Sequence, residues 1–204
     1  MKVEGKVIIF TGAGSGLGLE CVHRKYYSLL VLTGFHIVGL AGAGAHVIAV
    51  DRNIGNLKRT PKLHPYELDV TDWKGLKRLY QDVSSKYGRI DVVCNNAGLS
   101  ERMFLRSDQL LKIIARGGHF WVDEDAENYP TIDSNLTALM KSTRIAISTF
   151  LKQPKPKDGG PIGVIVNTTG VTGVMPCFPA PVHTASKWGI YMLYSVNDRC
   201  YGIH

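Results

Sequence analysis

A short apolar run that opens directly into a glycine-rich stretch restricts what this chain can fold into more than any other feature. Residues 6–11, KVIIFT, have the pattern of a buried parallel strand, and residues 11–18 read TGAGSGLG. Glycines in this arrangement allow a tight turn and let the backbone approach a pyrophosphate at the amino end of a helix. We therefore predict a dinucleotide-binding turn, with a helix starting near Gly16. The alternative is a glycine-rich turn that has no ligand.

The next apolar run ends in an acidic residue. Residues 45–50, AHVIAV, predict a second strand, and Asp51 follows it directly. A carboxylate at this point accepts hydrogen bonds from a ribose 2′-hydroxyl and repels a 2′-phosphate, which favours NAD over NADP. Arg52 argues the other way, because it could accept a phosphate. The alternative is that Asp51 is an exposed residue at the end of the strand and binds no ligand.

The rest of the chain alternates between strand and helix patterns. Further strands are predicted at residues 63–70, 89–96 and 163–168, and helices at residues 71–87, 132–151 and 183–196. The first of these helices has an apolar face, formed by Trp73, Leu76, Leu79 and Val83. Such alternation indicates parallel βαβ units, and 204 residues suit one α/β domain over residues 1–204.

Composition narrows the classes of partner. The formal net charge is +7, but the basic residues are dispersed and no aromatic residues interleave with them, so we expect no nucleic-acid partner. The four cysteines have neither metal nor redox spacing, and the seven histidines do not cluster in the sequence. We therefore expect no metal site, and scattered thiols favour a cytoplasmic protein.

One uncharged stretch is long enough to cross a bilayer. Residues 28–50 contain no Asp, Glu, Lys or Arg over 23 positions. The stretch also contains His36, His46 and several glycines, and its end reads as the strand before Asp51. We favour helix, loop and strand over a membrane span, and we expect neither a membrane partner nor a signal peptide at Met1.

Several motifs occur in a fixed order along the chain, and together they indicate a specific family. They are TGxxxGxG at residues 11–18, Asp69-Val70, NNAG at residues 95–98, Asn135, and Lys187 within HTASK. In this order the chain resembles the short-chain dehydrogenase/reductase family from Val3 to Leu193. Residues 160–189 look most like the NAD-dependent hydroxyprostaglandin dehydrogenase-like branch. The resemblance implies a Rossmann-type doubly wound parallel sheet with strand order 3-2-1-4-5.

The resemblance also implies a role for each matching residue. The pyrophosphate turn would be formed by Thr11, Gly12, Gly16 and Gly18, and Asp69 and Val70 would flank the adenine. The end of the fourth strand beside the cofactor would be formed by Asn95, Ala97 and Gly98. Lys187 would bind the nicotinamide ribose, and Asn135 would hold a water in a proton relay.

Two catalytic positions of the family hold other residues here. The tyrosine expected four residues before Lys187 is His183, and the serine expected 13 residues earlier is Gly170. The catalytic set implied by the resemblance is therefore Asn135, His183 and Lys187. We favour His183 as an ordinary residue at a helix start, and the alternative is a replacement base, although imidazole is shorter than phenol. Nearby hydroxyls are out of register; they are Thr168, Thr169 and Thr172.

The chain also departs from the family in length. Asp51 follows Gly18 by 33 positions, where about 20 are expected, and we predict insertions near residues 23–39 and 102–117. The chain stops at His204, soon after its last predicted helix, so we expect a C-terminally truncated sheet whose fifth strand is an unprotected edge. A diverged family member and an imperfect gene model both account for these departures.

Two functions remain open. The first is NAD-dependent hydride transfer on a secondary alcohol or ketone, with activity impaired by the changes at positions 170 and 183. The second is an NAD-binding protein without turnover, which would act as a sensor or as a partner subunit. The first implies a small-molecule substrate, whose identity the sequence does not give, and it leaves a homo-oligomer open.

Overall fold

The computed structural model describes residues 2–15, 39–99, 129–156, 159–177 and 180–200, without the side chains of residues 194–200. The chain forms two compact units. One is built from residues 1–97 and 140–168, and the other from residues 98–139 and 169–204. The helix predicted to start near Gly16 lies outside the described residues, as do the expected insertions except for Gly39.

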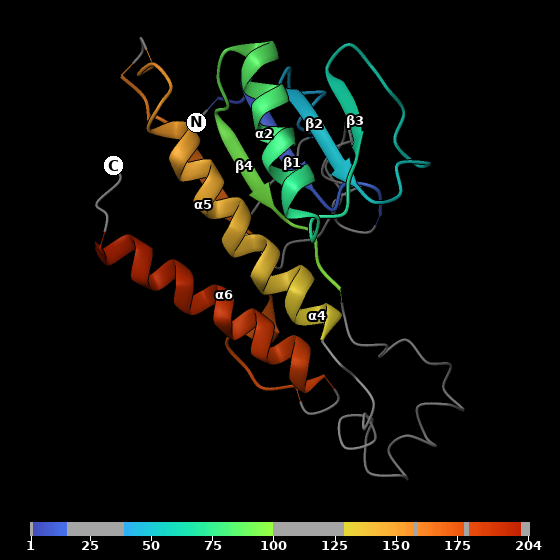
Figure 1. Cartoon of the computed structure of the whole chain (residues 1–204), viewed down its shortest axis with the longest axis vertical. Coiled ribbons are helices and arrows are strands. Elements are labelled where there is room, and N and C mark those ends of the chain that lie inside the picture. The colour runs from blue at the N-terminus through green and yellow to red at the C-terminus, as the bar shows by residue number, and fades with distance from the viewer. Residues whose placement is uncertain (1, 16–38, 100–128, 157–158, 178–179, 201–204) are drawn as a thin grey trace. The chain divides into compact units, whose positions relative to one another are not determined.

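The first unit contains a five-stranded parallel sheet of order β3-β2-β1-β4-β5 (Figure 1). Its strands are β1 (Val7–Thr11), β2 (His46–Asp51), β3 (Leu63–Glu67), β4 (Val92–Asn95) and β5 (Val164–Asn167). The chain winds outward from β1 to β3 and then returns to the other side of β1 for β4 and β5. This reversal confirms the predicted Rossmann-type strand order.

The central strand shows why the sheet is parallel and buried. Every residue of β1 is buried, and β1 pairs with β2 on one side and β4 on the other, with Ile8 opposite both Val47 and Val92. A continuous apolar run is what a strand covered on both faces requires, because its successive side chains point to opposite faces.

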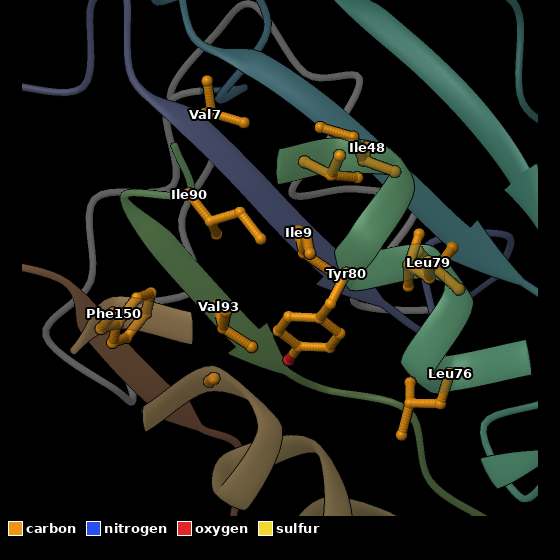
Figure 2. Packing of buried hydrophobic residues seen from close by; sticks show 12 residues of the cluster. Val7, Ile9, Ile48, Leu76, Leu79, Tyr80, Ile90, Val93 and Phe150 are labelled. Carbon is orange, nitrogen blue, oxygen red and sulfur yellow. The ribbon is translucent and has the colours of Figure 1, made fainter. Parts of the chain in front are cut away.

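One face of the sheet is covered by helix α2 (Trp73–Tyr87) and by residues 140–150 of helix α5 (Ala138–Phe150). Figure 2 shows the core on this face, with Tyr80 reaching from α2 toward Val93 of β4. The buried residues of this core include Val7, Ile9, Ile48, Leu76, Leu79, Val83, Ile90, Ala146 and Phe150. The alternate residues Ile8, Phe10, Val47 and Ala49 pack on the opposite face with Ala45 and Leu57.

Helix α2 is bounded by clear end signals. The Asp72 carboxylate caps its start by accepting hydrogen bonds from the backbone amides of Lys74 and Gly75. Gly88 ends it in the left-handed conformation, with φ of 76°. One part of the predicted apolar face was wrong, since Trp73 is half exposed and Tyr80 is buried instead. Trp73 is the first residue of the helix and has no preceding turn to pack against, and the Lys141 ammonium lies 4.5 Å from its ring centre.

The second unit is mainly helical in the residues that the structure describes. It contains α4 (Pro130–Ile132), the π-helical turn η2 (Asp133–Thr137), the 3-10 turn η3 (Val171–Gly173) and helix α6 (Pro181–Cys200). The helix predicted at residues 132–151 therefore exists but is interrupted by a π turn at its start, and α6 begins two residues earlier than predicted. Over the part of the chain that the structure describes, no helix is both long and apolar enough to cross a membrane.

Candidate functional site

The glycine turn after β1 is shaped by a close backbone approach. Gly12 has φ of 70°, and a Cβ at this position would lie 2.7 Å from Cα of Ala97. A side chain at position 12 would therefore need both an unfavourable backbone conformation and a displaced loop after β4. The structure thus brings Gly12 and Ala97 together, while Gly16 and Gly18 lie outside the described residues.

Thr11 fastens this turn to the loop after β4. Its buried Oγ1 accepts hydrogen bonds from the backbone amides of Asn96, at 3.0 Å, and Ala97, at 3.1 Å. The same hydroxyl donates to the carbonyl oxygen of Cys94 at 3.3 Å. Thr11 therefore holds the loops after β1 and β4 together.

Asn96 also joins the glycine turn to the loop after β4, and the sequence analysis did not single it out. Its Nδ2 donates to the carbonyl oxygens of Thr11, at 3.1 Å, and Gly12, at 3.3 Å, and its Oδ1 accepts from the Thr168 hydroxyl at 3.2 Å. The second asparagine of NNAG was the available signal, because an amide both donates and accepts.

Asn95, by contrast, serves the interior of the first unit. Its Oδ1 accepts from Ser142 Oγ at 2.6 Å, and its Nδ2 donates to Asn167 Oδ1 at 2.9 Å and to Thr143 Oγ1 at 3.3 Å. The Tyr80 hydroxyl extends this network to Ser142 Oγ at 2.8 Å, and burial raises the pKa of Tyr80. With each polar atom of the Asn95 side chain engaged, its side chain fixes the end of β4.

Asp51 is held beside the glycine turn by two backbone amides. Its Oδ2 accepts from the Gly14 amide at 2.8 Å and its Oδ1 from the Asn53 amide at 3.0 Å. A Cβ on Gly14 would overlap the Asn53 carbonyl oxygen, and Asn56 Nδ2 donates to the Gly14 carbonyl at 3.1 Å. The carboxylate therefore has a defined position at the end of β2, and Gly14 is a second glycine that packing requires.

The pair predicted to flank an adenine follows β3 in the first unit. Asp69 is exposed, and its Oδ1 accepts from the Thr71 amide at 2.9 Å and from the Thr71 hydroxyl at 2.7 Å. These hydrogen bonds favour the ionised carboxylate and lower the pKa of Asp69. Val70 is half-buried beside it.

Asn135 organises the second unit. It is fully buried within the π turn η2, and its Oδ1 accepts from the Leu99 amide at 2.6 Å. Its Nδ2 donates to the Leu99 carbonyl and to Ser186 Oγ, each at 2.9 Å. π turns inside helices frequently mark functional positions, because the extra residue re-aims a side chain.

His183 lies in the same network. It is the third residue of α6, and its Nδ1 is 3.0 Å from the Leu99 carbonyl oxygen and 3.3 Å from Asn135 Nδ2. The Ser186 hydroxyl donates to the His183 carbonyl at 2.6 Å. The structure therefore brings the predicted residues Asn135 and His183 together.

Lys187 lies one helical turn after His183. Its side chain is only 6% exposed, and burial lowers its pKa. A Cβ on Gly98 would lie 3.7 Å from Lys187 Nζ and 3.1 Å from Asn135 Oδ1. Gly98, Asn135 and Lys187 thus meet at one point of the second unit.

The position of the expected serine is open. Gly170 is exposed and its backbone is extended. Apart from its chain neighbours, a Cβ at this position would have one described atom within 4 Å, the Thr172 hydroxyl at 3.9 Å. The Thr169 hydroxyl instead donates to the Lys187 carbonyl at 3.4 Å. The backbone would accept a serine at position 170, but this chain has no hydroxyl there.

The sequence model of the family described as short chain dehydrogenase matches residues 6–201. The chain belongs to the short-chain dehydrogenase family. The chain is 33% identical over 198 residues to a 3-oxoacyl-(acyl-carrier-protein) reductase of Thermotoga maritima, and the comparison covers 93% of this chain and 65% of the relative.

Two further relatives bear the name 15-hydroxyprostaglandin dehydrogenase (NAD(+)). The Homo sapiens protein is 27% identical over 194 residues and the Rattus norvegicus protein 26% identical over 190 residues. Each comparison covers 93% of this chain and 59% of the relative. The chain therefore spans about three fifths of the length of these relatives.

Sequence reasoning missed the residues that support the candidate site. The Leu99 backbone and the Ser186 side chain bind Asn135, and neither position carries a chemical signature of its own. The sequence did contain one indication, because Ser186 lies within HTASK and its hydroxyl directly precedes Lys187.

Proposed function

We propose that this chain is an NAD-dependent oxidoreductase that transfers a hydride between NAD and a secondary alcohol or ketone, at an impaired rate. The observation that carries the proposal is the convergence of Asn135 Oδ1 and Lys187 Nζ on Gly98. A buried amine beside a fixed amide is a costly arrangement, because burial opposes the charged form of lysine. Such an arrangement is typical of a site that uses the amine.

The residues of the first unit fit a dinucleotide. Gly12 and Gly14 supply two positions without a side chain in the turn after β1, and Asp51 offers a carboxylate in a fixed position for ribose hydroxyls. Its negative charge supports NAD over NADP. When bound, the nicotinamide would supply the hydride acceptor. Lys187 would hold the nicotinamide ribose, and Thr11, Asn95 and Asn96 would fix the loops from which Ala97 and Gly98 approach the cofactor.

The impairment follows from position 170. A hydroxyl there would donate to the substrate oxygen, and losing such a donor costs about 10²–10³ in rate. A phenol at position 183 is also absent, and losing a positioned acid or base costs about 10²–10⁴. These losses need not add, since such groups act as a unit.

A second candidate function is NAD binding without turnover, as a sensor or partner subunit. The observation that favours it is Gly170, which leaves the place of the donor hydroxyl without a side chain. Either function implies a small-molecule ligand and leaves homo-oligomerisation open. Cys94 and Cys177 form no disulfide, which supports a cytoplasmic location.

The test measures binding and turnover separately. NADH binding to the full chain is followed by the fluorescence of NADH. Turnover is measured with a panel of secondary alcohols, by the absorbance of the NADH that forms as NAD is reduced. We expect binding with slow turnover, and weaker binding in Lys187→Met. Binding without any turnover would favour the second function, and no binding of either nucleotide would contradict both.

A further inference from the structure

Three side-chain rings gather at the amino edge of the sheet, where its parallel strands begin. His46 is the first residue of β2, His64 is the second residue of β3, and Tyr87 is the last residue of α2. His46 is two residues before Ile48, which packs under α2 and lies opposite His64, so both histidines lie on the face that α2 covers. Asp51 is at the other end of β2, so this cluster is separate from the glycine turn.

The rings are close to one another. Those of His46 and His64 are stacked with centroids 6.2 Å apart, and the Tyr87 ring lies 5.5 Å from the first and 6.0 Å from the second. Each ring has a buried polar atom without a hydrogen-bond partner among the described residues, namely His46 Nδ1, His64 Nε2 and the Tyr87 hydroxyl. Such atoms are costly to bury, since each gives up its hydrogen bonds to water. Their presence in one cluster indicates a polar ligand.

The contact of His46 with Lys62 shows that the unpartnered atom of His46 is a donor. Lys62 lies opposite His46, because the Val47 amide donates to the Lys62 carbonyl at 2.8 Å, and Lys62 Nζ is 3.0 Å from His46 Nε2. An ammonium group only donates, so Nε2 accepts this hydrogen bond and the hydrogen of the neutral ring is on Nδ1. A protonated ring carries a hydrogen on Nδ1 as well. In both states His46 Nδ1 requires an acceptor.

Three cationic side chains adjoin the rings. Besides Lys62, the Lys86 ammonium lies 5.0 Å from the centre of the Tyr87 ring, and Arg59 lies in the connection between β2 and β3. Burial lowers the pKa of His64, and the charges of Lys86 and Arg59 lower it further, which shows that both act on this ring. Among the described residues, none of the three cations forms an ion pair with a carboxylate. The cluster therefore offers positive charge and donors without an acceptor of opposite charge.

The carboxyl end of α2 acts against an anion, because a helix carries about half a negative charge there. Three full positive charges outweigh this effect, and Lys86 lies in the last turn itself. The same charges repel a metal ion, although two imidazoles are present. The electrostatics of the cluster thus favour an anionic ligand over a cation.

We infer that this cluster binds a phosphate group, either as the free ion or as a monoester. The charge would come from Lys62, Lys86 and Arg59, and His46 Nδ1 and the Tyr87 hydroxyl would donate hydrogen bonds to the phosphate oxygens. A phosphate fits better than a carboxylate, because it carries about two negative charges near neutral pH and has more acceptor oxygens. The site belongs to the first unit alone and does not depend on the proposed function.

The first experiment measures binding at the rings themselves. The full chain is labelled with ¹⁵N-histidine and titrated with inorganic phosphate at constant ionic strength, which is maintained with chloride. The signals of His46 and His64 are assigned from His46→Gln and His64→Gln. We expect both sets of signals to shift along one saturable curve. Shifts that do not saturate, or no shifts, would overturn the inference, as would zinc chloride shifting these signals at lower concentrations than phosphate.

Charge variants separate a built site from general attraction to a basic chain. Lys62→Gln combined with Lys86→Gln should raise the dissociation constant for phosphate at least about tenfold. Lys74→Gln combined with Lys77→Gln, at exposed positions of α2, makes the same change in net charge and should leave the constant within about twofold. Equal weakening by both pairs would contradict a specific site.

A smaller change keeps the test independent of folding. Tyr87→Phe removes only the hydroxyl and should weaken phosphate binding about tenfold, because a hydrogen bond to a charged group is lost. The urea midpoint of each variant shows whether it is folded. An affinity unchanged in Tyr87→Phe would remove the Tyr87 hydroxyl from the site and overturn the arrangement proposed here.

The charge of His64 provides a second readout. A bound dianion favours the imidazolium, so it should raise the pKa of His64 relative to its value in chloride. Sulfate is the probe, because it stays dianionic while the histidines titrate. The other groups that act on His64 in this cluster are His46, Arg59 and Lys86, all of them bases, and their charges lower its pKa. A pKa of His64 that is the same in sulfate and in chloride would contradict binding beside this ring.

Two further ligands identify the source of the phosphate and its place. Glycerol 3-phosphate binding more tightly than inorganic phosphate would assign the site to an ester, and equal binding would assign it to the free ion; both results support the site. NADH should leave the phosphate affinity unchanged, because the glycine turn lies at the other edge of the sheet. Displacement of phosphate by NADH would overturn the inference. If NADH does not bind at all, the proposed function fails while the phosphate site stands.

Discussion

The hydroxyl of Thr172 lies 3.9 Å from the point that a Cβ on Gly170 would occupy. No other described atom outside the chain neighbours of Gly170 comes within 4 Å of that point. The backbone at Gly170 is extended, a conformation open to any residue. A serine would therefore be accommodated at position 170 without displacing its surroundings.

Restoring both family hydroxyls should raise the rate. We predict that Gly170→Ser combined with His183→Tyr increases kcat/KM for a secondary alcohol by about 10² or more, because a substrate donor is regained. Steady-state NAD reduction measures the change. Gly170→Ala, which adds the Cβ without the hydroxyl, is the matched control and should remain slow. An equal gain in Gly170→Ala would show that the hydroxyl is not responsible.

Asp51 should determine which nucleotide binds. We predict that NADH binds at least about tenfold more tightly than NADPH, because a carboxylate facing a 2′-phosphate is a repulsive pair. Asp51→Asn removes the charge while keeping an oxygen that accepts from the Gly14 amide, so it should narrow this ratio. Fluorescence titration of each nucleotide checks both values. Tighter NADPH binding by the unmodified chain would contradict the assignment.

Two histidines in the first unit lie together although they are far apart in the sequence. The rings of His46 and His64 are stacked with centroids 6.2 Å apart, and the Tyr87 ring lies 5.5 Å from the first and 6.0 Å from the second. Lys62 Nζ lies 3.0 Å from His46 Nε2. His46 Nδ1, His64 Nε2 and the Tyr87 hydroxyl are buried atoms that have no hydrogen-bond partner among the described residues.

This ring cluster should make stability depend on pH. Burial lowers the pKa of His64 from 6.5, and the charges of Lys86 and Arg59 act in the same direction. The folded chain then binds fewer protons than the unfolded chain, so stability is complete above about pH 6.5 and decreases as the pH falls through the lower folded value.

We predict a lower urea midpoint at pH 5.5 than at pH 7.5, and a smaller difference in His64→Phe, which keeps a ring but does not titrate. The lowered pKa of Asp69 acts only below its ordinary value of 3.8 and falls outside this window. The same pH dependence in both proteins would assign the effect to other groups.

Strand β5 is an edge of the sheet in the part of the chain that the structure describes, and its Val166 is 38% exposed. Exposed apolar edges pair with other chains, so we predict concentration-dependent self-association. Val166→Lys should reduce it, whereas Leu151→Lys, at the end of α5, should not. Light scattering over a range of protein concentrations measures the effect. A monodisperse monomer would contradict the prediction.

The strands could be predicted because local patterns specify them, whereas their order was predicted from the resemblance to a family. Continuous apolar runs predict buried parallel strands, and the glycine turn after β1 determines where the winding begins. The end of β3 was predicted three residues too far along, at Val70, because Asp69 and Thr71 form a local turn that competes with the strand.

The supporting contacts of the candidate site could not be predicted in this way. The hydrogen bonds of Asn135 to Leu99 and Ser186 join residues 36 and 51 positions apart. These hydrogen-bond partners depend on how the folded chain brings distant residues together and on the extra residue of the π turn. Neither can be inferred from the type of the residue alone. For the same reason the bonds of the Asn95 side chain to Asn167 and Ser142 inside the first unit could not be predicted from its motif.

The π turn at Asp133–Thr137 makes chain length, as well as residue type, a condition for this network. Each helical residue advances about 100° around the axis. Deleting one residue between Pro130 and Asn135 would regularise the turn and rotate the asparagine amide away from Leu99 and Ser186, although every residue named in the site would still be present. In comparisons among related chains, a one-residue gap before the asparagine would therefore signal a lost network that a motif search would score as intact.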